Sequence, residues 1–292
     1  MKILVIGMNG FLGRNLSEIM KYEKFEILSI VRKINFRPKN FEIIKDDIFN
    51  LKAKSLKRIK KFKPEAVINL AWSGIPDYSF RNSLKNFLNH FNFFQKIITV
   101  KSIKKFIMIG SSWEYFSNTG SCSEKDKENN LNPFTWSKNS IYKYINRNTK
   151  EKKIKFIWLR VFFMYGKYQK KKSLIPHIIY NLKKNDKPKI LSPNSSNDFV
   201  HVNDVCKAII LATKKKNISG IFNVGFGKPI LVREIYELIL NKLGKKGNKY
   251  QISTKLYKNK KDNYANIKKI SLKLNWKPKI DINEGINKLL KV

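Results

Sequence analysis

Cysteine and histidine are scarce in this chain: its 292 residues include two cysteines and three histidines. Cys122 and Cys206 lie far apart and form none of the short spacings typical of zinc or redox sites. We therefore expect no metal, no disulfide framework and a reducing compartment, the cytoplasm. No apolar run approaches the roughly 18 residues of a membrane span, and no signal-peptide pattern opens the chain, so membrane insertion is not expected.

Acidic residues are also few, since 21 of them face 61 basic residues and the formal net charge is +40. Only 8 of the basic residues are arginine, the side chain that reads bases and binds phosphates with two nitrogens. The lysines are scattered, and no helix-turn-helix, finger or RNP pattern presents them. We expect no nucleic-acid partner, but an attraction for anionic ligands.

The first 160 residues alternate short apolar runs with longer amphipathic stretches. The apolar runs predict strands at 2–7, 26–31, 41–46, 66–72, 104–112 and 155–161. The remaining patterns predict helices at 11–22, 79–101, 174–184, 203–215 and 231–243, and a strand at 220–225 that returns to the sheet. Near-continuous apolar strands between helices are typical of a parallel sheet covered on both faces. The predicted fold is α/β, a Rossmann-like doubly wound parallel sheet with a smaller C-terminal substrate lobe.

The regular alternation of apolar runs and amphipathic stretches ends after Gly166, where prolines mark loops. We expect residues 1–166 and the strand near 220–225 to form a dinucleotide-binding domain. Residues 167–219 and 226–292 are expected to form the substrate-binding lobe.

The segment VIGMNGFLG places Gly7, Gly10 and Gly13 between the first strand and its helix. Glycines there allow a tight turn and let backbone N–H groups and the helix dipole approach a pyrophosphate. The spacing is G-x-x-G-x-x-G, and turn glycines without a ligand are the alternative. We favour dinucleotide binding because of the position in the sheet.

The end of the second predicted strand carries Arg32 and Lys33, where NAD-binding chains have a carboxylate and NADP-binding chains have basic residues. This favours NADP, with NAD as the alternative cofactor. Asp47 and Ile48 follow the third strand, where a carboxylate can accept from the adenine amino group; Asp46 could equally be a turn residue.

Ser111 and Ser112 end the fifth strand, so their hydroxyls are expected at the ligand-binding edge of the sheet. No G-x-S-x-G elbow surrounds them, and His90, His177 and His201 have no triad or metalloprotease context. Hydrolytic chemistry is therefore not predicted.

Together these motifs resemble the extended short-chain dehydrogenase/reductase family, in particular its nucleotide-sugar epimerases, dehydratases and 4-ketoreductases. The likeness covers nearly the whole chain, and its motifs are GMNGFLG, DDI, VINLAW, GSSWEY, NPFTWSK, LRVFFMYG, SLIP, NDFVHVNDV, GIFNVGFG and LNWKPKIDINEGI. The stretch GSSWEYFSNTGSCSE is most similar to the sugar 4-ketoreductase and 4-dehydrogenase branch.

The resemblance implies roles for particular residues. Ser111 falls at the catalytic Ser/Thr position, and Lys138 matches the lysine that binds the nicotinamide ribose. The implied cofactor-binding residues are Gly7, Asn9, Gly10, Phe11, Leu12, Gly13, Arg32, Asp47, Ile48, Leu70, Ala71, Trp72 and Lys138. The implied substrate-binding residues are Ser111, Ser112, Trp113 and His201, the last toward the nucleotide or else structural.

The chain departs from the family at Phe134, which stands where the family has its tyrosine acid–base. General acid catalysis contributes roughly 10²–10⁴-fold, so binding should persist while turnover slows. Three explanations stay open: a sluggish or non-catalytic relative, a substitute hydroxyl such as Tyr115 or Ser111, or an engineered block. Phe163 and Asn197 also replace a frequent asparagine and arginine on the substrate side.

The resemblance implies an NAD(P)-dependent oxidoreductase or epimerase that acts at C4 of a nucleotide-linked deoxysugar in the synthesis of surface polysaccharide precursors. The alternative is a catalytically impaired dinucleotide-binding or sensing protein. The implied partners are a nucleotide-sugar substrate and a second copy of the chain, a homodimer through helices 79–101 and 135–149.

Overall fold

The computed structural model describes residues 1–34, 38, 41–116, 119–245, 250–252 and 262–291. The chain divides into two compact units. The first unit comprises Met1–Phe116, Lys127–Arg160 and Cys206–Phe222, and the second comprises Ser117–Asp126, Val161–Val205 and Asn223–Val292. Within the predicted substrate lobe, residues 246–249, 253–261 and 292 lie outside the described part.

A seven-stranded sheet forms the first unit, in the order β12-β7-β5-β4-β1-β2-β3. The strands are β1 Lys2–Ile6, β2 Glu26–Val31, β3 Phe41–Lys45, β4 Ala66–Asn69, β5 Lys105–Ser111, β7 Lys155–Val161 and β12 Gly220–Val224. The pairs from β3 to β5 run parallel, with Ile3 opposite Ile27 on one side and Ala66 on the other. The predicted α/β class and parallel sheet are confirmed, and β12 returns to the sheet edge as expected.

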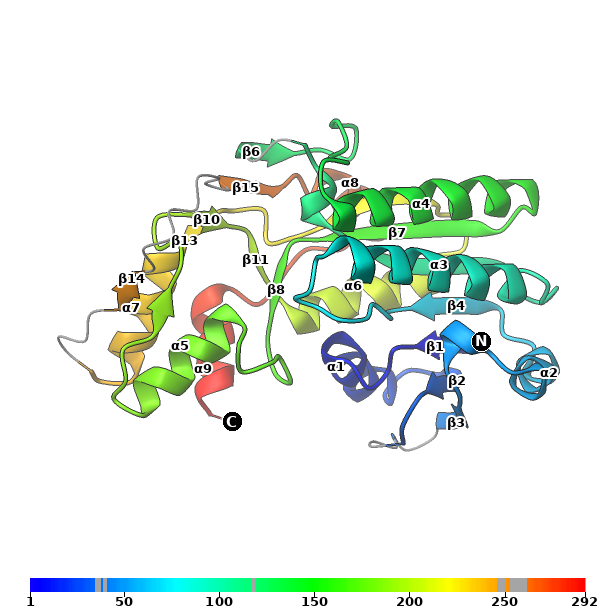
Figure 1. The fold of residues 1–292 in the computed structure, drawn as a ribbon, viewed down its shortest axis with the longest axis horizontal. Helices are drawn as coiled ribbons and strands as arrows, with labels where there is room; N and C mark the ends of the chain where they lie inside the picture. The colour runs from blue at the N-terminus through cyan, green and yellow to red at the C-terminus, as the bar shows by residue number, and fades with distance from the viewer. Residues whose placement is uncertain (35–37, 39–40, 117–118, 246–249, 253–261, 292) are drawn as a thin grey trace. The chain divides into compact units, whose positions relative to one another are not determined.

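Helices cover both faces of this sheet (Figure 1). They are α1 Phe11–Met20, α2 Ala53–Phe62, α3 Phe80–Ile97, α4 Pro133–Glu151 and α6 Val202–Lys214, with the short 3-10 turns η1 Ile48–Asn50 and η2 Ser112–Glu114. In Figure 1, α3 and α4 lie side by side on one face and α1 and α6 lie on the other. The helices bury apolar stripes against the strands, as Phe93, Phe94 and Ile97 of α3 do.

The second unit is built from short strands and four helices. The strands pair as β8 Phe163–Tyr165 with β11 Phe199–His201, β9 Lys189–Ile190 with β14 Gln251–Ile252, β10 Ser196–Asn197 with β13 Ile230–Leu231, and β6 Thr119–Cys122 with β15 Asp262–Ala265. The helices are α5 Leu174–Lys183, α7 Val232–Lys242, α8 Lys268–Leu274 and α9 Ile282–Leu290. Asp198 is fully buried and accepts backbone hydrogen bonds from Phe226, Gly227 and Ala265, which joins three segments of this unit.

The observed units differ from the expected domains in several segments. Residues 117–126, 161–166 and 223–225 were expected in the dinucleotide-binding domain but lie in the second unit. Residues 206–219 were expected in the substrate lobe but lie in the first unit. The buried Lys105 side chain shows why, because its Nζ donates to the carbonyls of Ala212, Thr213 and Lys215 at the end of α6. These bonds tie the end of α6 to the start of β5. No helix in the described ranges is long and apolar enough to cross a membrane.

Candidate active site

The chain turns from β1 into α1 on Gly7, which has a φ of +86°. A Cβ at Gly7 would lie 2.8 Å from the backbone nitrogen of Ala71, so both conformation and space require glycine. A Cβ at Gly13 would lie 2.3 Å from the Gly7 carbonyl oxygen, so the helix approaches the turn too closely for a side chain. Gly10 is the N-cap of α1, and no side chain caps this helix, which leaves its first N–H groups for a ligand.

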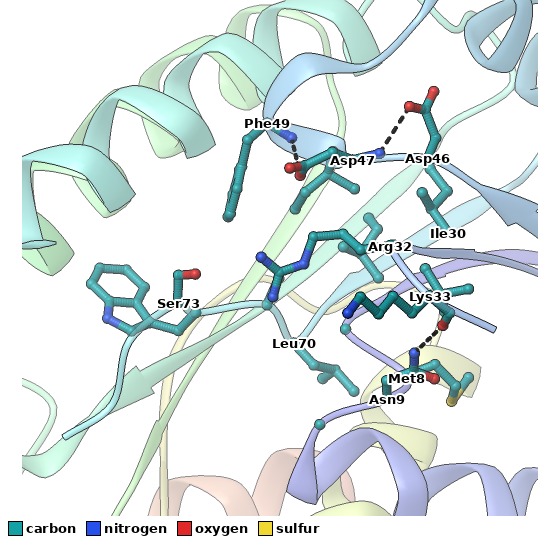
Figure 2. A pocket seen from close by; sticks show the side chains of 17 residues that line it. Met8, Asn9, Ile30, Arg32, Lys33, Asp46, Asp47, Phe49, Leu70 and Ser73 are labelled. Atoms are coloured by element: carbon teal, nitrogen blue, oxygen red, sulfur yellow. Dashed lines mark hydrogen bonds between the residues drawn. The ribbon is translucent and has the colours of Figure 1, made fainter. Parts of the chain in front are cut away.

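A pocket of about 580 Å³ opens beside this turn (Figure 2). It lies where strands β1, β2 and β4 end, beside the point at which strand order reverses. The predicted cofactor residues that line it are Gly7, Asn9, Gly10, Arg32, Asp47, Ile48, Leu70, Ala71 and Trp72. The structure adds Ile6, Met8, Ile30, Val31, Lys33, Asp46, Phe49 and Ser73. The predicted residues Phe11, Leu12 and Gly13 occupy the first turn of α1 instead.

The end of β2 is basic. Figure 2 shows the Arg32 side chain lying between Asp47 and Leu70. A second pocket of about 570 Å³ is lined by Arg32, Lys45, Asp46, Asp47, Asn50 and Lys52. Three basic and two acidic side chains therefore line this second pocket.

Both aspartates of this region also make local hydrogen bonds. Asp47 Oδ1 accepts from Phe49 N at 3.1 Å and caps η1. Asp46 accepts from the backbone nitrogens of Asp47 and Lys52. Burial raises the pKa of Asp46, but hydrogen bonds from Ser55 and these two nitrogens outweigh it and leave the pKa below its ordinary value.

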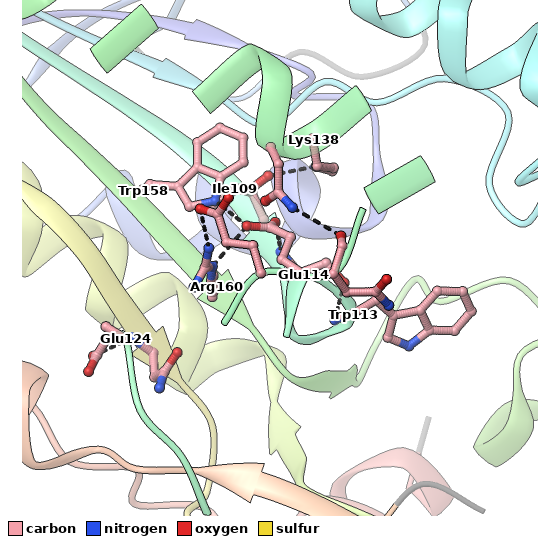
Figure 3. Close-up of polar contacts among 12 residues, drawn as sticks. Ile109, Trp113, Glu114, Glu124, Lys138, Trp158 and Arg160 are labelled. Carbon is pink, nitrogen blue, oxygen red and sulfur yellow. Dashed lines mark hydrogen bonds and ion pairs between the residues drawn. The ribbon is translucent and has the colours of Figure 1, made fainter. Parts of the chain in front are cut away.

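Phe134 and Lys138 lie one turn apart near the start of α4, where Asn132 caps the helix and Pro133 takes its first position. Both side chains are buried. Lys138 Nζ donates to the Ile109 carbonyl at 2.7 Å (Figure 3) and lies 4.0 Å from the centre of the Trp72 ring. Burial lowers the pKa of Lys138 to about 8, opposed by the charge of Glu114. Because Trp72 lines the cofactor pocket, the ammonium stands beside it.

Three aromatic rings contact Phe134 edge-on. The ring centres lie 5.5 Å away for Trp72, 5.1 Å for Tyr78 and 6.0 Å for Trp113. Tyr78 was not among the predicted site residues, because it lies in the loop between β4 and α3, where no periodic pattern singles it out. Phe134 therefore belongs to an aromatic cluster of four rings, and Tyr78 is its one phenol.

Ser111 is held in place by Glu114, which is fully buried. Glu114 accepts from Ser111 N at 2.6 Å, Trp158 Nε1 at 2.8 Å and Arg160 Nε at 2.9 Å, and Figure 3 shows Trp158 and Arg160 converging on it. Ser111 Oγ accepts from Trp113 N at 3.2 Å, which leaves the hydroxyl proton for another partner.

Tyr115 and Ser112 are both buried. The Arg160 guanidinium lies 4.6 Å from the centre of the Tyr115 ring. The Tyr115 side chain is only 1% exposed, which argues against contact between its hydroxyl and a substrate oxygen.

Two histidines, His201 and His90, are buried in different units of the chain. His201 lies in the second unit, where it is buried, accepts from Asn203 N and packs edge-on against Tyr165; its approach to a nucleotide stays a prediction. His90 is buried in α3, stacks on Trp72 and receives no hydrogen bond at Nε2. Burial and the nearby Lys138 charge lower the pKa of His90 to about 3. Among the described residues no cluster of three or more metal-ligating side chains occurs.

The first unit thus has the features of a dinucleotide-binding fold with an acid–base position at its edge. The profile of the NAD dependent epimerase/dehydratase family matches residues 3–225, and the chain belongs to this family. It is 26% identical to the dTDP-4-dehydro-6-deoxyglucose reductase of Escherichia coli, over 99% of this chain and 96% of that one. It is also 26% identical to the ADP-L-glycero-D-manno-heptose-6-epimerase of Brachyspira hyodysenteriae, over 99% and 97%.

A solved structure with the same fold is a tyrosine-to-phenylalanine variant of UDP-glucuronic acid 4-epimerase from Bacillus cereus. It contains UDP-4-deoxy-4-fluoro-glucuronic acid and NAD. The TM-score is 0.85 at 22% identity, over 100% of this chain and 99% of that one. The expected family of nucleotide-sugar epimerases, dehydratases and reductases is confirmed by these comparisons.

The pocket of this chain fits a nicotinamide dinucleotide. Gly7 and the uncapped start of α1 leave backbone N–H groups and space for a pyrophosphate. Trp72 lines the pocket, and the Lys138 ammonium lies 4.0 Å from the centre of its ring, where it would hold the ribose at the nicotinamide end. The residues present are therefore those that would hold the cofactor at both of its ends.

Proposed function

We propose that the chain is an NADP-dependent oxidoreductase that acts at C4 of a nucleotide-linked deoxysugar, in the supply of surface polysaccharide precursors. The observation that carries this proposal is the bond from Lys138 Nζ to the Ile109 carbonyl, two residues before Ser111 on β5, with the ammonium against Trp72 of the pocket. The proposal further comprises a two-lobed enzyme in the cytoplasm, acting as a homodimer, with the second unit receiving the sugar nucleotide.

In this proposal the residues of the chain bind the cofactor, orient the sugar and polarise its reacting carbonyl. The turn at Gly7 and Gly10 holds the pyrophosphate, Arg32 holds the 2′-phosphate, and Lys138 holds the nicotinamide ribose. The Ser111 hydroxyl donates to the sugar oxygen, where negative charge develops. When bound, the reduced nicotinamide supplies the hydride. Trp113 and Ser112 form the sugar side of the site, and His201 approaches the nucleotide.

The test is single-turnover oxidation of NADPH with dTDP-4-dehydro-6-deoxyglucose as the 4-keto probe. We expect the chain to oxidise NADPH, and Phe134→Tyr to do so faster, because a phenol next to Lys138 restores a proton donor. The full factor for a general acid is about 10²–10⁴, and the gain is smaller if another hydroxyl already donates. Phe91→Tyr is the matched control, since it adds a phenol to a half-buried ring outside the site.

The second candidate function is that of a dinucleotide-binding or sensing protein, and Phe134 is the observation that favours it. If neither the chain nor Phe134→Tyr oxidises NADPH although both bind it, the oxidoreductase proposal is wrong and this candidate replaces it. A dependence on NADH in place of NADPH would overturn only the assignment of Arg32.

A further inference from the structure

The predicted residues of the candidate site do not include a clear proton donor. Hydride addition to a carbonyl carbon leaves an alkoxide, which needs a proton. Phe134 has none to give, and Tyr115 is buried at 1% exposure with the Arg160 guanidinium over its ring. The remaining phenol that touches the Phe134 ring is that of Tyr78, with the two ring centres 5.1 Å apart.

The ring of Tyr78 is restrained by its neighbours. Its ring packs against Trp113 as well as Phe134, with centres 4.8 Å apart in the first case. Within the described part of the chain its hydroxyl makes no hydrogen bond, and the residue is half-buried. Burial raises the pKa of Tyr78 above its ordinary value of 10, so the phenol keeps its proton at neutral pH.

The loop that carries Tyr78 is fixed at both ends by side-chain amides of α3. Asn86 Oδ1 accepts from Ser73 N at 2.8 Å, and Asn82 Nδ2 donates to Asp77 O at 2.7 Å. Ser79 then caps α3 directly after the tyrosine. A donor on such a restrained loop is positioned before the substrate arrives, which is the condition for efficient proton transfer.

We propose that Tyr78 is the proton donor of this site, in place of the phenol that Phe134 lacks. The inference rests on the proposed function. In the step, the C–H bond forms at the sugar carbonyl carbon with the two electrons of the hydride, and the C=O π pair moves to oxygen. The Tyr78 O–H bond breaks as its proton passes to that oxygen. The C–H bond that breaks is that of the reduced nicotinamide, which would supply the hydride when bound and would thereby be oxidised. The Tyr78 phenolate then takes a proton from water.

The test compares Tyr78→Phe with the unaltered chain in the NADPH oxidation assay described above. This change removes only the hydroxyl and keeps the ring that packs on Phe134 and Trp113. We expect the single-turnover rate to fall about 10²-fold or more, with the affinities for NADPH and sugar nucleotide unchanged. Tyr144→Phe is the matched control: its ring is also half-buried, packs on Phe91 and lies in α4 away from the site, and its rate should stay unchanged.

A double variant separates loss of the proton donor from loss of structure. Adding Phe134→Tyr to Tyr78→Phe should restore the rate, since it returns a phenol to the same cluster. If Tyr78→Phe reacts as fast as the unaltered chain, the inference is overturned while the proposed function stands. If no variant, Phe134→Tyr included, oxidises NADPH, the proposed function fails and the inference fails with it.

Discussion

Replacing Glu114 by glutamine should destabilise the first unit strongly, because Glu114 and Arg160 form an ion pair that is almost completely inaccessible to solvent, at 0% and 1% exposure. The carboxylate accepts from three donors, and an amide would present an NH₂ group to at least one of them. Arg160 would keep its charge, with Glu128 at 3.4 Å as its remaining anionic partner. Removing one partner of a buried pair typically costs about 3–5 kcal/mol.

Urea unfolding followed by circular dichroism measures this cost. We expect the midpoint to fall with little change in slope, because the surface exposed on unfolding stays the same. Glu151→Gln is the control: it breaks the solvent-exposed pair with Arg147 and should leave the midpoint unchanged. The double variant Glu114→Gln with Arg160→Met should recover most of the loss, since no unpaired charge remains. A loss below about 1 kcal/mol for Glu114→Gln alone would refute the reasoning, since it would show that the buried charge is compensated elsewhere.

Two further predictions concern the cofactor. Arg32→Gln should weaken NADPH binding about 10- to 100-fold and leave NADH binding unchanged, since a hydrogen bond to a charged group contributes roughly 1.5–3 kcal/mol. Fluorescence titrations with the two cofactors measure this difference. Equal effects on both cofactors would contradict the 2′-phosphate assignment. The pKa of Lys138 is about 8, so its ammonium is present below that pH and lost above it. The dissociation constant for NADPH should therefore be constant below pH 8 and rise about tenfold per pH unit above it. The variant Lys138→Met should bind NADPH weakly at every pH, with no change of slope near pH 8. A flat profile for the unaltered chain would count against ribose binding by this lysine.

The local features of the fold could be predicted from the sequence because they depend on local patterns. The strand predicted at 26–31 matches β2, Glu26–Val31, since six successive residues suit a strand buried on both faces. The turn at Gly7 was predictable for the same reason, as glycine spacing reports backbone geometry directly. Helix α2 was not predicted, because lysines interrupt its apolar stripe: two of its ten residues are buried.

The contacts that complete the site could not be predicted, because they join segments distant in sequence. Glu114 and Arg160 are 46 residues apart, and neither belongs to a motif that names its partner. The contact between Tyr78 and Phe134 likewise depends on how the loop after β4 meets the start of α4. Side-chain identity alone gives no indication of such pairs, since tyrosines, glutamates and arginines occur throughout the chain.

Because Phe134 has no hydroxyl, cofactor binding and proton transfer would depend on different residues at this site. The groups that would hold the cofactor are the backbone of the glycine turn, the basic end of β2 and Lys138, and none of them depends on an oxygen at position 134. Cofactor affinity therefore cannot distinguish an enzyme from a sensing protein in this chain. Hydride transfer can, because it leaves a charge on the substrate oxygen that only a nearby proton neutralises. On the proposed function, the activity of the chain therefore depends on one hydroxyl, and the ring contact between Tyr78 and Phe134 is the reason for proposing that of Tyr78.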